Sequence, residues 1–259
     1  MGVDIMNPYI GEIIVVDSDS ALYKCSVCFC NYSYIVGHCE AKSFLHVEEL
    51  EYFNKLKFEN RIKSYLIGRY AAKRAFLHQT SENSLQHVYI KSGVFGQPVF
   101  GSPFTHNLQL SITHSGDMGG AIVFPESCPM GIDIECISNV SRSGFISQIT
   151  NSEKSLVFNS QSENRMNESG VLAIIWSAKE SLSKVLKTGL TVPFEVLEIS
   201  DITNVGDYYI CYYKNFIQYY TLSTCKDDYL LSITYPKNLK LQNIEHVIKG
   251  FHESVESVR

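Results

Sequence analysis

The carboxylates of one short segment are spaced for metal chemistry. In Gly131-Ile132-Asp133-Ile134-Glu135 apolar and acidic residues alternate, which is the pattern of a half-buried strand. Such a strand turns its two isoleucines to the core and places Asp133 and Glu135 together on the other face. Taken alone, the pentapeptide is better explained as an ordinary half-buried strand with a solvated outer face, so chemistry requires a second group of residues.

That second group lies on a predicted helix. Glu180 and Lys184 are four residues apart and are therefore neighbours on one helix face. Exposed pairs of this kind are common and typically contribute less than ~1 kcal/mol. Together with Asp133 and Glu135, however, Glu180 would complete a three-carboxylate site suited to Mg²⁺, which binds substrate phosphates and keeps several waters. Lys184 would then balance the phosphate charge.

An arginine interrupts the apolar stripe of another predicted helix. Arg69 shares this stripe with Ile62, Leu66, Ala72 and Phe76, and a guanidinium buried there requires an anionic partner. A substrate phosphate suits its fork of donors. A protein carboxylate, or a side chain that reaches solvent from the edge of the stripe, is an equally good explanation.

Elements of both kinds must position these residues. Each half of the chain contains a long helical pattern followed by alternating segments, which predicts an α+β fold with antiparallel sheets. We predict strands at 13–16, 22–35, 88–91, 98–100, 108–113, 120–124, 130–137, 194–199, 208–213, 216–223 and 229–235, and helices at 47–79 with an interruption near Asn60, at 171–187 and at 244–258.

The composition excludes several classes of protein. The 259 residues are 45% hydrophobic and 19% charged with a net charge of -5, which is typical of a globular chain. This acidic balance argues against a nucleic-acid surface or an anionic-membrane surface, so any anion site must be local. The sequence has neither an export signal nor a run approaching ~18 apolar residues, and we expect a cytoplasmic protein without a membrane partner.

Cysteines offer an alternative metal site. Cys25, Cys28, Cys30 and Cys39 resemble half a zinc site. In a strand, however, Cys25 points to the opposite face from Cys28 and Cys30. Eight cysteines diluted over a chain without an export signal are expected to be reduced thiols. Buried cysteines that act as small hydrophobic residues are therefore the favoured interpretation.

Taken together, the motifs resemble those of a known family, the Sfp-type 4'-phosphopantetheinyl transferases of the holo-carrier-protein synthase superfamily. That family carries a Gly-x-Asp-x-Glu strand and a Trp-x-x-Lys-Glu-x-x-x-Lys helix, and both occur here in order, at 131–135 and 176–184. The resemblance spans roughly residues 45–200. Further matching segments are IGRYAAK (67–73), GQP (96–98), SITHSG (111–116) and GLTVPF (189–194).

The resemblance implies a fold of two similar, pseudo-symmetric halves, each a long helix packed on an antiparallel sheet, with coenzyme A in the cleft between them. Residues 1–125 would form the nucleotide-binding half and residues 126–259 the metal-binding and catalytic half. The implied reaction is transfer of 4'-phosphopantetheine from coenzyme A to a serine of an apo acyl- or peptidyl-carrier protein, with release of adenosine 3',5'-bisphosphate. Mg²⁺ or Mn²⁺ would be the metal, and the protein is expected to be a monomer without a nucleic-acid partner.

The resemblance also implies roles for individual residues. Asp133, Glu135 and Glu180 would bind the metal. Glu180 would deprotonate the serine directly or through water, Lys184 would stabilise the departing phosphate, and Glu153 would stand beside the catalytic cleft. Gln97 replaces the usual lysine of a Gly-Lys-Pro turn, so this turn lacks a cation. The residues expected to contact coenzyme A are Arg61, Arg69, Gln97, Pro98, Thr113, His114, Lys179 and Lys184.

Two other functions fit some of these features. A metal-dependent nuclease also uses Asp, Glu and Lys near a metal, but here Glu180 and Lys184 lie on a helix and the chain has no basic aromatic groove. A noncatalytic module that binds coenzyme A or a carrier protein would keep the fold without turnover. The intact set of Asp133, Glu135 and Glu180 disfavours such a module.

Overall fold

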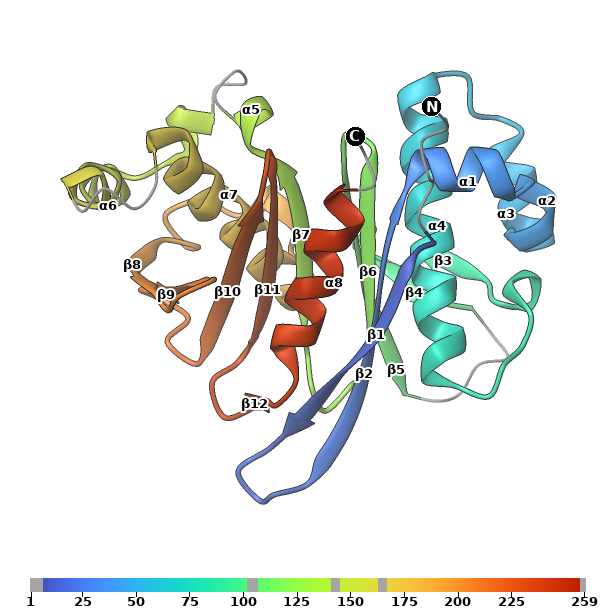
Figure 1. Cartoon of the computed structure of the whole chain (residues 1–259), viewed down its shortest axis with the longest axis horizontal. Helices are drawn as coiled ribbons and strands as arrows, with labels where there is room; N and C mark the ends of the chain where they lie inside the picture. The colour runs from blue at the N-terminus through green and yellow to red at the C-terminus, as the bar shows by residue number, and fades with distance from the viewer. Residues whose placement is uncertain (1–6, 102–106, 141–144, 163–166, 257–259) are drawn as a thin grey trace. The chain divides into compact units, whose positions relative to one another are not determined.

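The chain divides into two compact units. The computed structural model describes residues 7–101, 107–140, 145–162 and 167–256. Unit 1 comprises Met1–Pro129 and Leu239–Arg259, and unit 2 comprises Met130–Asn238. Each unit combines helices with an antiparallel sheet (Figure 1), which confirms the predicted α+β class. No helix among the described residues is long and apolar enough to cross a membrane.

Unit 1 is built on a five-stranded antiparallel sheet in the order β12-β1-β2-β6-β5. The long helix α4 packs against β2, β5 and β6, and the C-terminal helix α8 packs on β1 and β2. A separate hairpin joins β3 to β4. The bounds are β1 Tyr9–Val16, β2 Leu22–Asn31, α1 Tyr32–His38, α2 Ala41–Phe44, α3 Val47–Phe53, α4 Glu59–Gln79, the 3₁₀ turn Leu85–His87, β3 Ile90–Ser92, β4 Pro98–Phe100, β5 Leu108–Ser115, β6 Met118–Pro125, β12 Lys240–Leu241 and α8 Ile244–Glu256.

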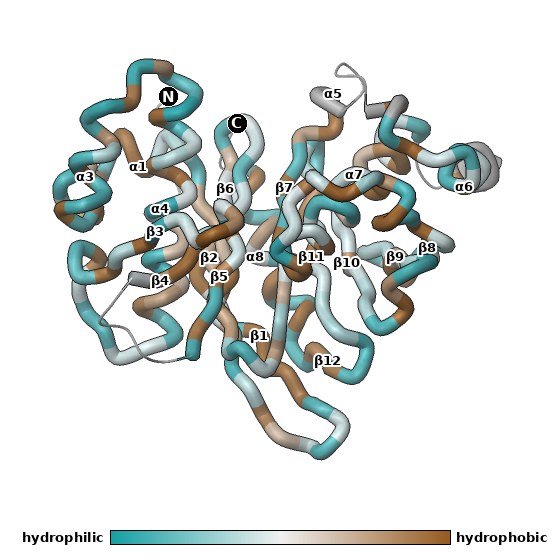
Figure 2. Tube along the Cα trace, turned by 180° about the vertical axis from the view of Figure 1, so that it is seen from behind, coloured by the Kyte–Doolittle hydropathy of each residue, from teal (hydrophilic) through white to brown (hydrophobic). Residues whose placement is uncertain are grey.

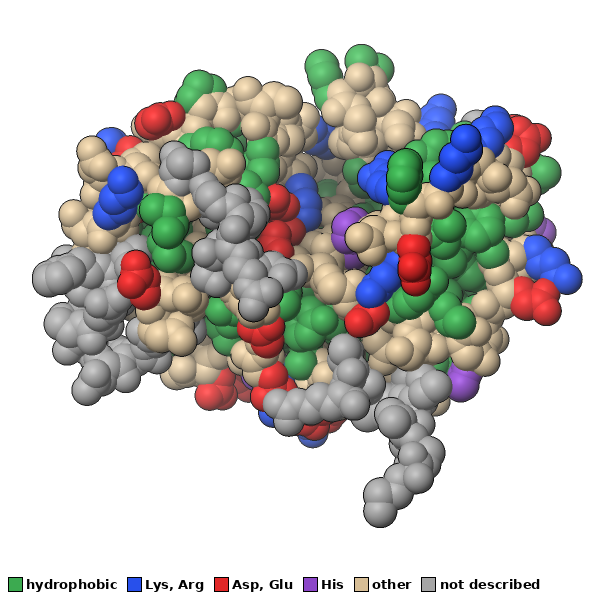
Figure 3. Space-filling model, turned by 90° about the horizontal axis from the view of Figure 1, so that it is seen from above, with side chains coloured by type: hydrophobic (Ala, Val, Ile, Leu, Met, Phe, Trp, Pro, Cys, Tyr) green, Lys and Arg blue, Asp and Glu red, His purple; other side chains and the backbone are tan. Residues whose placement is uncertain are grey.

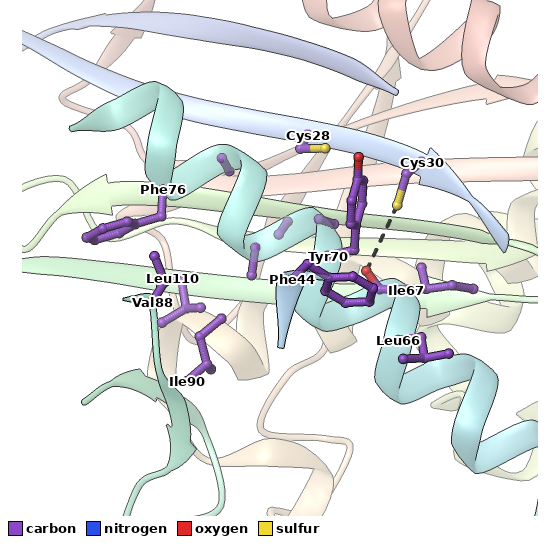
Figure 4. Close-up of a cluster of buried hydrophobic side chains, with 14 of the residues drawn as sticks. Cys28, Cys30, Phe44, Leu66, Ile67, Tyr70, Phe76, Val88, Ile90 and Leu110 are labelled. Atoms are coloured by element: carbon purple, nitrogen blue, oxygen red, sulfur yellow. Dashed lines mark hydrogen bonds between the residues drawn. The ribbon is translucent and has the colours of Figure 1, made fainter. Parts of the chain in front are cut away.

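The core of unit 1 forms where α4 lies on the sheet. Ile67 and Phe76 of α4 are completely buried, and the ring of Tyr70 meets that of Phe44 edge-on with centroids 5.3 Å apart. Figure 4 shows these side chains together with Cys28 of β2. Figure 2 shows hydrophobic stretches along β1 and β2 and a hydrophilic turn between them, at the sequence DSDS. The alternation of these strands therefore buries one set of side chains under α4.

The cysteines of β2 belong to this core. Cys28 and Cys30 are buried among the apolar residues beneath α4, and the thiol of Cys30 lies 3.9 Å from the carbonyl oxygen of Ile67. Among the described residues, no group of cysteines gathers ligand atoms closely enough for a metal ion. The alternative of a zinc site receives no support, and burial raises the pKa of the Cys25 thiol, which disfavours the thiolate that zinc requires.

A buried ion pair fastens several elements of unit 1 together. Glu49 of α3 accepts the backbone N–H of its N-cap residue His46 at 3.0 Å and that of Ile90, at the start of β3, at 3.0 Å. Lys73 of α4 lies 2.5 Å from the same carboxylate, and both side chains are at most 1% exposed. Burial lowers the pKa of Lys73 to about 8, although Glu49 opposes this shift. One carboxylate thus connects two helices and a strand.

Unit 2 has the sheet order β7-β11-β10-β9-β8, again antiparallel. Helix α7 crosses β7, β10 and β11 (Figure 1). Ile132 and Ile134 of β7 are completely buried, as their alternation predicts. The bounds are β7 Gly131–Cys136, α5 Ile137–Val140, the 3₁₀ turn Phe145–Gln148, α6 Asn151–Ser162, α7 Glu168–Leu186, the 3₁₀ turn Gly189–Thr191, β8 Ile199–Asn204, β9 Tyr209–Tyr213, β10 Tyr219–Lys226 and β11 Tyr229–Pro236.

Two predicted elements of unit 1 differ from the structure. The strand expected to reach residue 35 ends at Asn31, whose side chain accepts the N–H of Tyr34 at 2.7 Å and so begins α1. The interruption expected near Asn60 in the helical region 47–79 is present, at residues 54–58 between α3 and α4. The C-terminal helix, expected in the second half, belongs to unit 1, where Phe251 packs edge-on against Phe29 at 5.4 Å. Long-range packing, which local periodicity does not encode, decides that placement.

Two elements of unit 2 also differ. Residues 194–197 form turns rather than a strand, since the N–H of Leu197 donates to the carbonyl oxygen of Phe194, and β8 begins only at Ile199. Helix α6 was not predicted because its residues show no clear apolar stripe. A local signal was nevertheless present, because Thr150 and Glu153 form a capping box in which each side chain bonds the backbone of the other.

Candidate metal centre

A glycine lets α7 approach β7 closely. A Cβ atom at Gly131 would lie 2.1 Å from the backbone oxygen of Ser181, which cannot move without displacing the helix. The Ser181 hydroxyl in turn donates a 3.0 Å hydrogen bond to the carbonyl oxygen of Gly131. Only glycine allows this approach, and the approach brings the carboxylates of β7 within reach of those on α7.

Gly131→Ala should therefore weaken metal binding as well as stability. We expect a loss of roughly 1–3 kcal/mol from overpacking and a lower affinity for Mn²⁺, measured by titration calorimetry. Gly68→Ala is the matched control, because there the added methyl group meets only a side-chain carbon of Ile112, at 2.9 Å. Equal metal affinity in the Gly131→Ala and Gly68→Ala variants would contradict the role of the close approach.

Asp133 is held from two sides. Its side chain is only 2% exposed. The ammonium of Lys184 donates to Oδ1 at 2.7 Å and also to the carbonyl oxygen of Ile132 at 2.9 Å. The hydroxyl of Ser177 donates to Oδ2 at 2.8 Å. Two donors, one on each oxygen, therefore fix the orientation of the carboxylate.

Glu135 and Glu180 complete the cluster. Trp176 donates its indole N–H to Oε1 of Glu135 at 3.1 Å. One oxygen from each of Asp133, Glu135 and Glu180 lies within 4.8 Å of the others. Three carboxylate oxygens converging in this way suit Mg²⁺ or Mn²⁺, which prefer oxygen ligands. The residues present therefore fit the metal that the sequence motifs imply.

Glu180 is the most perturbed acid of the cluster. Burial, followed by the negative charge of Asp133, raises the pKa of Glu180 to about 8, and Lys184 opposes the shift. The metal-free protein therefore holds a proton at this position at neutral pH. A divalent cation would have to displace that proton, so metal affinity should increase with pH up to about 8.

The raised pKa also predicts how stability depends on pH. The folded protein binds this proton more tightly than the unfolded chain, whose glutamate has the ordinary pKa of 4.5. The contribution of Glu180 to the free energy of unfolding is therefore complete below pH 4.5 and falls as pH rises toward about 8. In EDTA, Glu180→Gln should remove this component and melt several degrees higher than wild type at pH 8. Parallel pH profiles of the two proteins would contradict it.

Lys179 and Glu153 do not join the cluster. Lys179 donates to Oε2 of Glu153 at 2.7 Å, and both side chains are 0% exposed. Glu153 also accepts the N–H groups of Thr150 and Ile199, each at 2.8 Å. The same three kinds of bond hold Glu49 in unit 1, whose described residues form no such carboxylate cluster. The arrangement therefore fastens a helix N-terminus and a strand to the long helix in each unit.

The remaining predicted residues belong to unit 1. Arg61 is exposed on the first turn of α4. The guanidinium of Arg69 lies 4.8 Å from the ring centre of Tyr65, and its Nε lies 3.4 Å from Oε1 of Glu49. A protein carboxylate therefore accompanies Arg69, which was one of the alternatives open from the sequence.

Neighbouring positions on β5 and the β3–β4 turn complete the unit 1 set. Thr113 is buried on β5, whereas His114 next to it is exposed. The side-chain oxygen of Gln97 accepts the N–H of Phe95 at 3.0 Å, so it closes its own turn, and Pro98 begins β4. Gln97 therefore supplies the hydrogen-bond acceptor that closes this turn, at the position where the family usually has lysine.

Trp176 and Ser177 belong to the helix motif at 176–184, but the sequence predicts a role for neither residue. Both precede Glu180 on α7 and both donate to carboxylates of β7. Their positions three and four residues before Glu180 place them near the same helix face. That spacing was the available signal. The identity of their partners depends on the packing of α7 over β7.

Comparison with known proteins gives matches to one family. A family model described as the 4'-phosphopantetheinyl transferase superfamily matches residues 129–234, a segment that includes the whole cluster. A curated holo-[acyl-carrier-protein] synthase of Streptococcus uberis is 37% identical over 82 residues, which are 30% of this chain and 69% of the relative.

Two solved structures are also similar. A holo-(acyl-carrier-protein) synthase from Bacillus anthracis, solved in complex with CoA (3',5'-ADP), is 21% identical, with a TM-score of 0.36, and the match covers 43% of this chain and 96% of that one. The holo-ACP-synthase from Plasmodium yoelii is 19% identical, with a TM-score of 0.31, over 46% of this chain and 96% of the other.

Proposed function

This chain belongs to the 4'-phosphopantetheinyl transferase superfamily, and from that membership we propose that it transfers the 4'-phosphopantetheine arm of coenzyme A to a serine of an apo acyl- or peptidyl-carrier protein. The other product is adenosine 3',5'-bisphosphate. One observation carries the proposal, namely the convergence of Asp133, Glu135 and Glu180 beside Lys184 inside the segment that matches the family. Holo-carrier-protein synthase activity is the function that such a site supports best.

We assign Asp133, Glu135 and Glu180 as ligands of Mg²⁺ or Mn²⁺. When bound, the cation would neutralise charge on the pyrophosphate of coenzyme A and make its β-phosphate more susceptible to attack. Lys184 would stabilise the negative charge of the departing bisphosphate. The side chain of Lys184 is 25% exposed, so a substrate can reach it, and its ammonium lies 2.7 Å from Asp133, within the proposed metal site.

Glu180 is the residue that we assign as general base. It would accept the proton of the carrier serine as the hydroxyl oxygen attacks phosphorus. Burial raises its pKa to about 8 in the metal-free protein, and a bound cation would displace that proton and leave a carboxylate able to accept one. Such assistance is typically worth ~10²–10⁴ in rate.

For the nucleotide of coenzyme A we propose contacts with residues of unit 1. Arg61 and His114 present exposed side chains. Arg69 retains further N–H donors beyond the Nε that faces Glu49. Thr113 would be a further contact, and the turn at 97–98 would approach the nucleotide through its backbone groups. Lys179 and Glu153 instead receive a structural role, because their side chains are wholly buried against each other.

Intact-mass spectrometry of apo-carrier proteins tests the proposal. After incubation with the protein, coenzyme A and Mg²⁺, the carrier should gain one phosphopantetheine, and EDTA should prevent the gain. Binding of coenzyme A without any gain on acyl- and peptidyl-carrier proteins would identify a noncatalytic module. Cleavage of DNA by the same sample would identify a nuclease.

The surface gives no reason to prefer the nuclease. The face drawn in Figure 3 shows basic side chains interspersed with acidic ones rather than a continuous basic surface. The net charge of -5 agrees with this distribution. Nucleic-acid binding requires a concentrated basic surface.

A further inference from the structure

Ser177 donates its hydroxyl to a carboxylate of the sheet rather than to its own helix. Ser64, Ser183 and Ser254 each donate to a carbonyl oxygen of their own helix, at 2.7, 2.8 and 2.7 Å. Back-bonding of this kind is the usual outcome for serine within a helix. Ser177 instead donates across to Oδ2 of Asp133 at 2.8 Å. Its single donor is therefore committed to the carboxylate.

The surroundings make this bond difficult to replace. Ser177 is 0% exposed and Asp133 is 2% exposed, so bulk water does not reach the bond. Asp133 is paired in the sheet with Ser232, and the hydroxyl of Ser232 lies 2.8 Å from that of Ser223. The carboxylate thus stands in a buried polar layer between the sheet and α7. A lost donor in such a layer leaves an acceptor without its partner.

We propose that Ser177 is a positioning residue that restricts Asp133 to one metal-facing oxygen. The inference rests on the proposed function, in which Asp133 is a metal ligand. Lys184 donates to Oδ1 and Ser177 donates to Oδ2. Because both oxygens are held by hydrogen bonds, the carboxylate cannot rotate to bind one ion through both of them. With Oδ2 held by the buried hydroxyl, the carboxylate binds a cation through one oxygen.

This restriction has a consequence for metal preference. Trp176, the neighbour of Ser177, likewise occupies Oε1 of Glu135. A site that offers single oxygens suits Mg²⁺ and Mn²⁺, which have short bonds and octahedral geometry. Ca²⁺ requires six to eight oxygens and commonly takes both from one carboxylate. Holding the carboxylates by one oxygen each therefore disfavours Ca²⁺.

Titration calorimetry of the metal-free full chain with Mn²⁺ and, separately, with Ca²⁺ tests this inference without substrates. Ser177→Ala should raise the Kd for Mn²⁺ by at least ~10-fold, the usual effect of removing a partner of a metal ligand. The Kd for Ca²⁺ should rise less, because the freed Oδ2 becomes available as a second ligand. Ser177→Thr retains the hydroxyl and should return the Kd for Mn²⁺ to within about threefold of wild type.

Ser181→Ala is the matched control. Ser181 is equally buried, lies one turn further along α7 and donates to the carbonyl oxygen of Gly131 on β7 rather than to a carboxylate. Its hydroxyl oxygen also accepts the backbone N–H of Thr234 at 3.0 Å and lies 2.8 Å from the hydroxyl of that residue. This variant should lose stability and keep the wild-type ratio of Ca²⁺ to Mn²⁺ affinity.

The outcomes separate this inference from the proposed function. Unchanged Mn²⁺ affinity in Ser177→Ala, a parallel fall for Ca²⁺, or no Mn²⁺ binding by wild type would overturn the role of Ser177. Wild-type protein that binds Mn²⁺ but modifies no carrier protein would overturn the transfer reaction alone. In that case the selectivity change in Ser177→Ala would still establish the role of Ser177 at the metal.

Discussion

Glu180→Gln should lower kcat by at least ~10²-fold while changing KM for coenzyme A little. Glutamine has nearly the same shape and retains one oxygen for a metal, but it cannot accept the serine proton. The interaction that it removes is made in the transition state. Initial rates of carrier modification at saturating Mg²⁺, with intact-mass detection, measure the effect.

Stability provides the companion readout for this variant. Because burial raises the pKa of Glu180 to about 8, the metal-free glutamine variant should be at least as stable as wild type above neutral pH. If the variant is more stable than wild type and yet has a far lower kcat, the loss of rate does not come from unfolding. Glu168→Gln, an exposed position in the first turn of the same helix, is the control. Near-normal kcat in Glu180→Gln would exclude Glu180 as the base.

Lys179→Met should destabilise unit 2 by roughly 3–5 kcal/mol, because it leaves the buried Glu153 without its cationic partner. Glu153 and Lys179 are both 0% exposed, and the carboxylate also holds the start of α6 and of β8. The single tryptophan of the chain, Trp176, lies in α7 of unit 2. Its fluorescence during urea unfolding therefore reports the stability of that unit.

The matched variant is in the other unit. Lys73→Met breaks the corresponding pair with Glu49, and we expect a similar loss, detected in unit 1 by circular dichroism rather than by Trp176. The double variant Lys179→Met/Glu153→Leu should recover much of the loss, because it removes both charges together. A stable Lys179→Met protein with a raised KM for coenzyme A would instead restore the phosphate-binding role that the resemblance implies.

Local patterns in the sequence predicted which residues of the central elements share a face, although the face of Asp133 is covered by α7 rather than solvated. The alternation of 131–135 predicts that Ile132 and Ile134 are buried and that Asp133 and Glu135 share a face, because successive side chains of a strand point to opposite sides. The spacing of Glu180 and Lys184 likewise predicts one helix face. The family could be inferred from these motifs, because their order and separation along the chain are read from the sequence alone.

Tertiary structure alone decided which partner each polar group meets. Lys179 is adjacent to Glu180 in sequence, yet it turns into the core toward Glu153, and Arg69 lies beside Glu49. Ser177 reaches Asp133, 44 positions away, only because α7 lies close against β7 at Gly131. Periodicity describes the side of an element on which a residue lies. The group across from it depends on packing between segments distant in sequence, which no local pattern records.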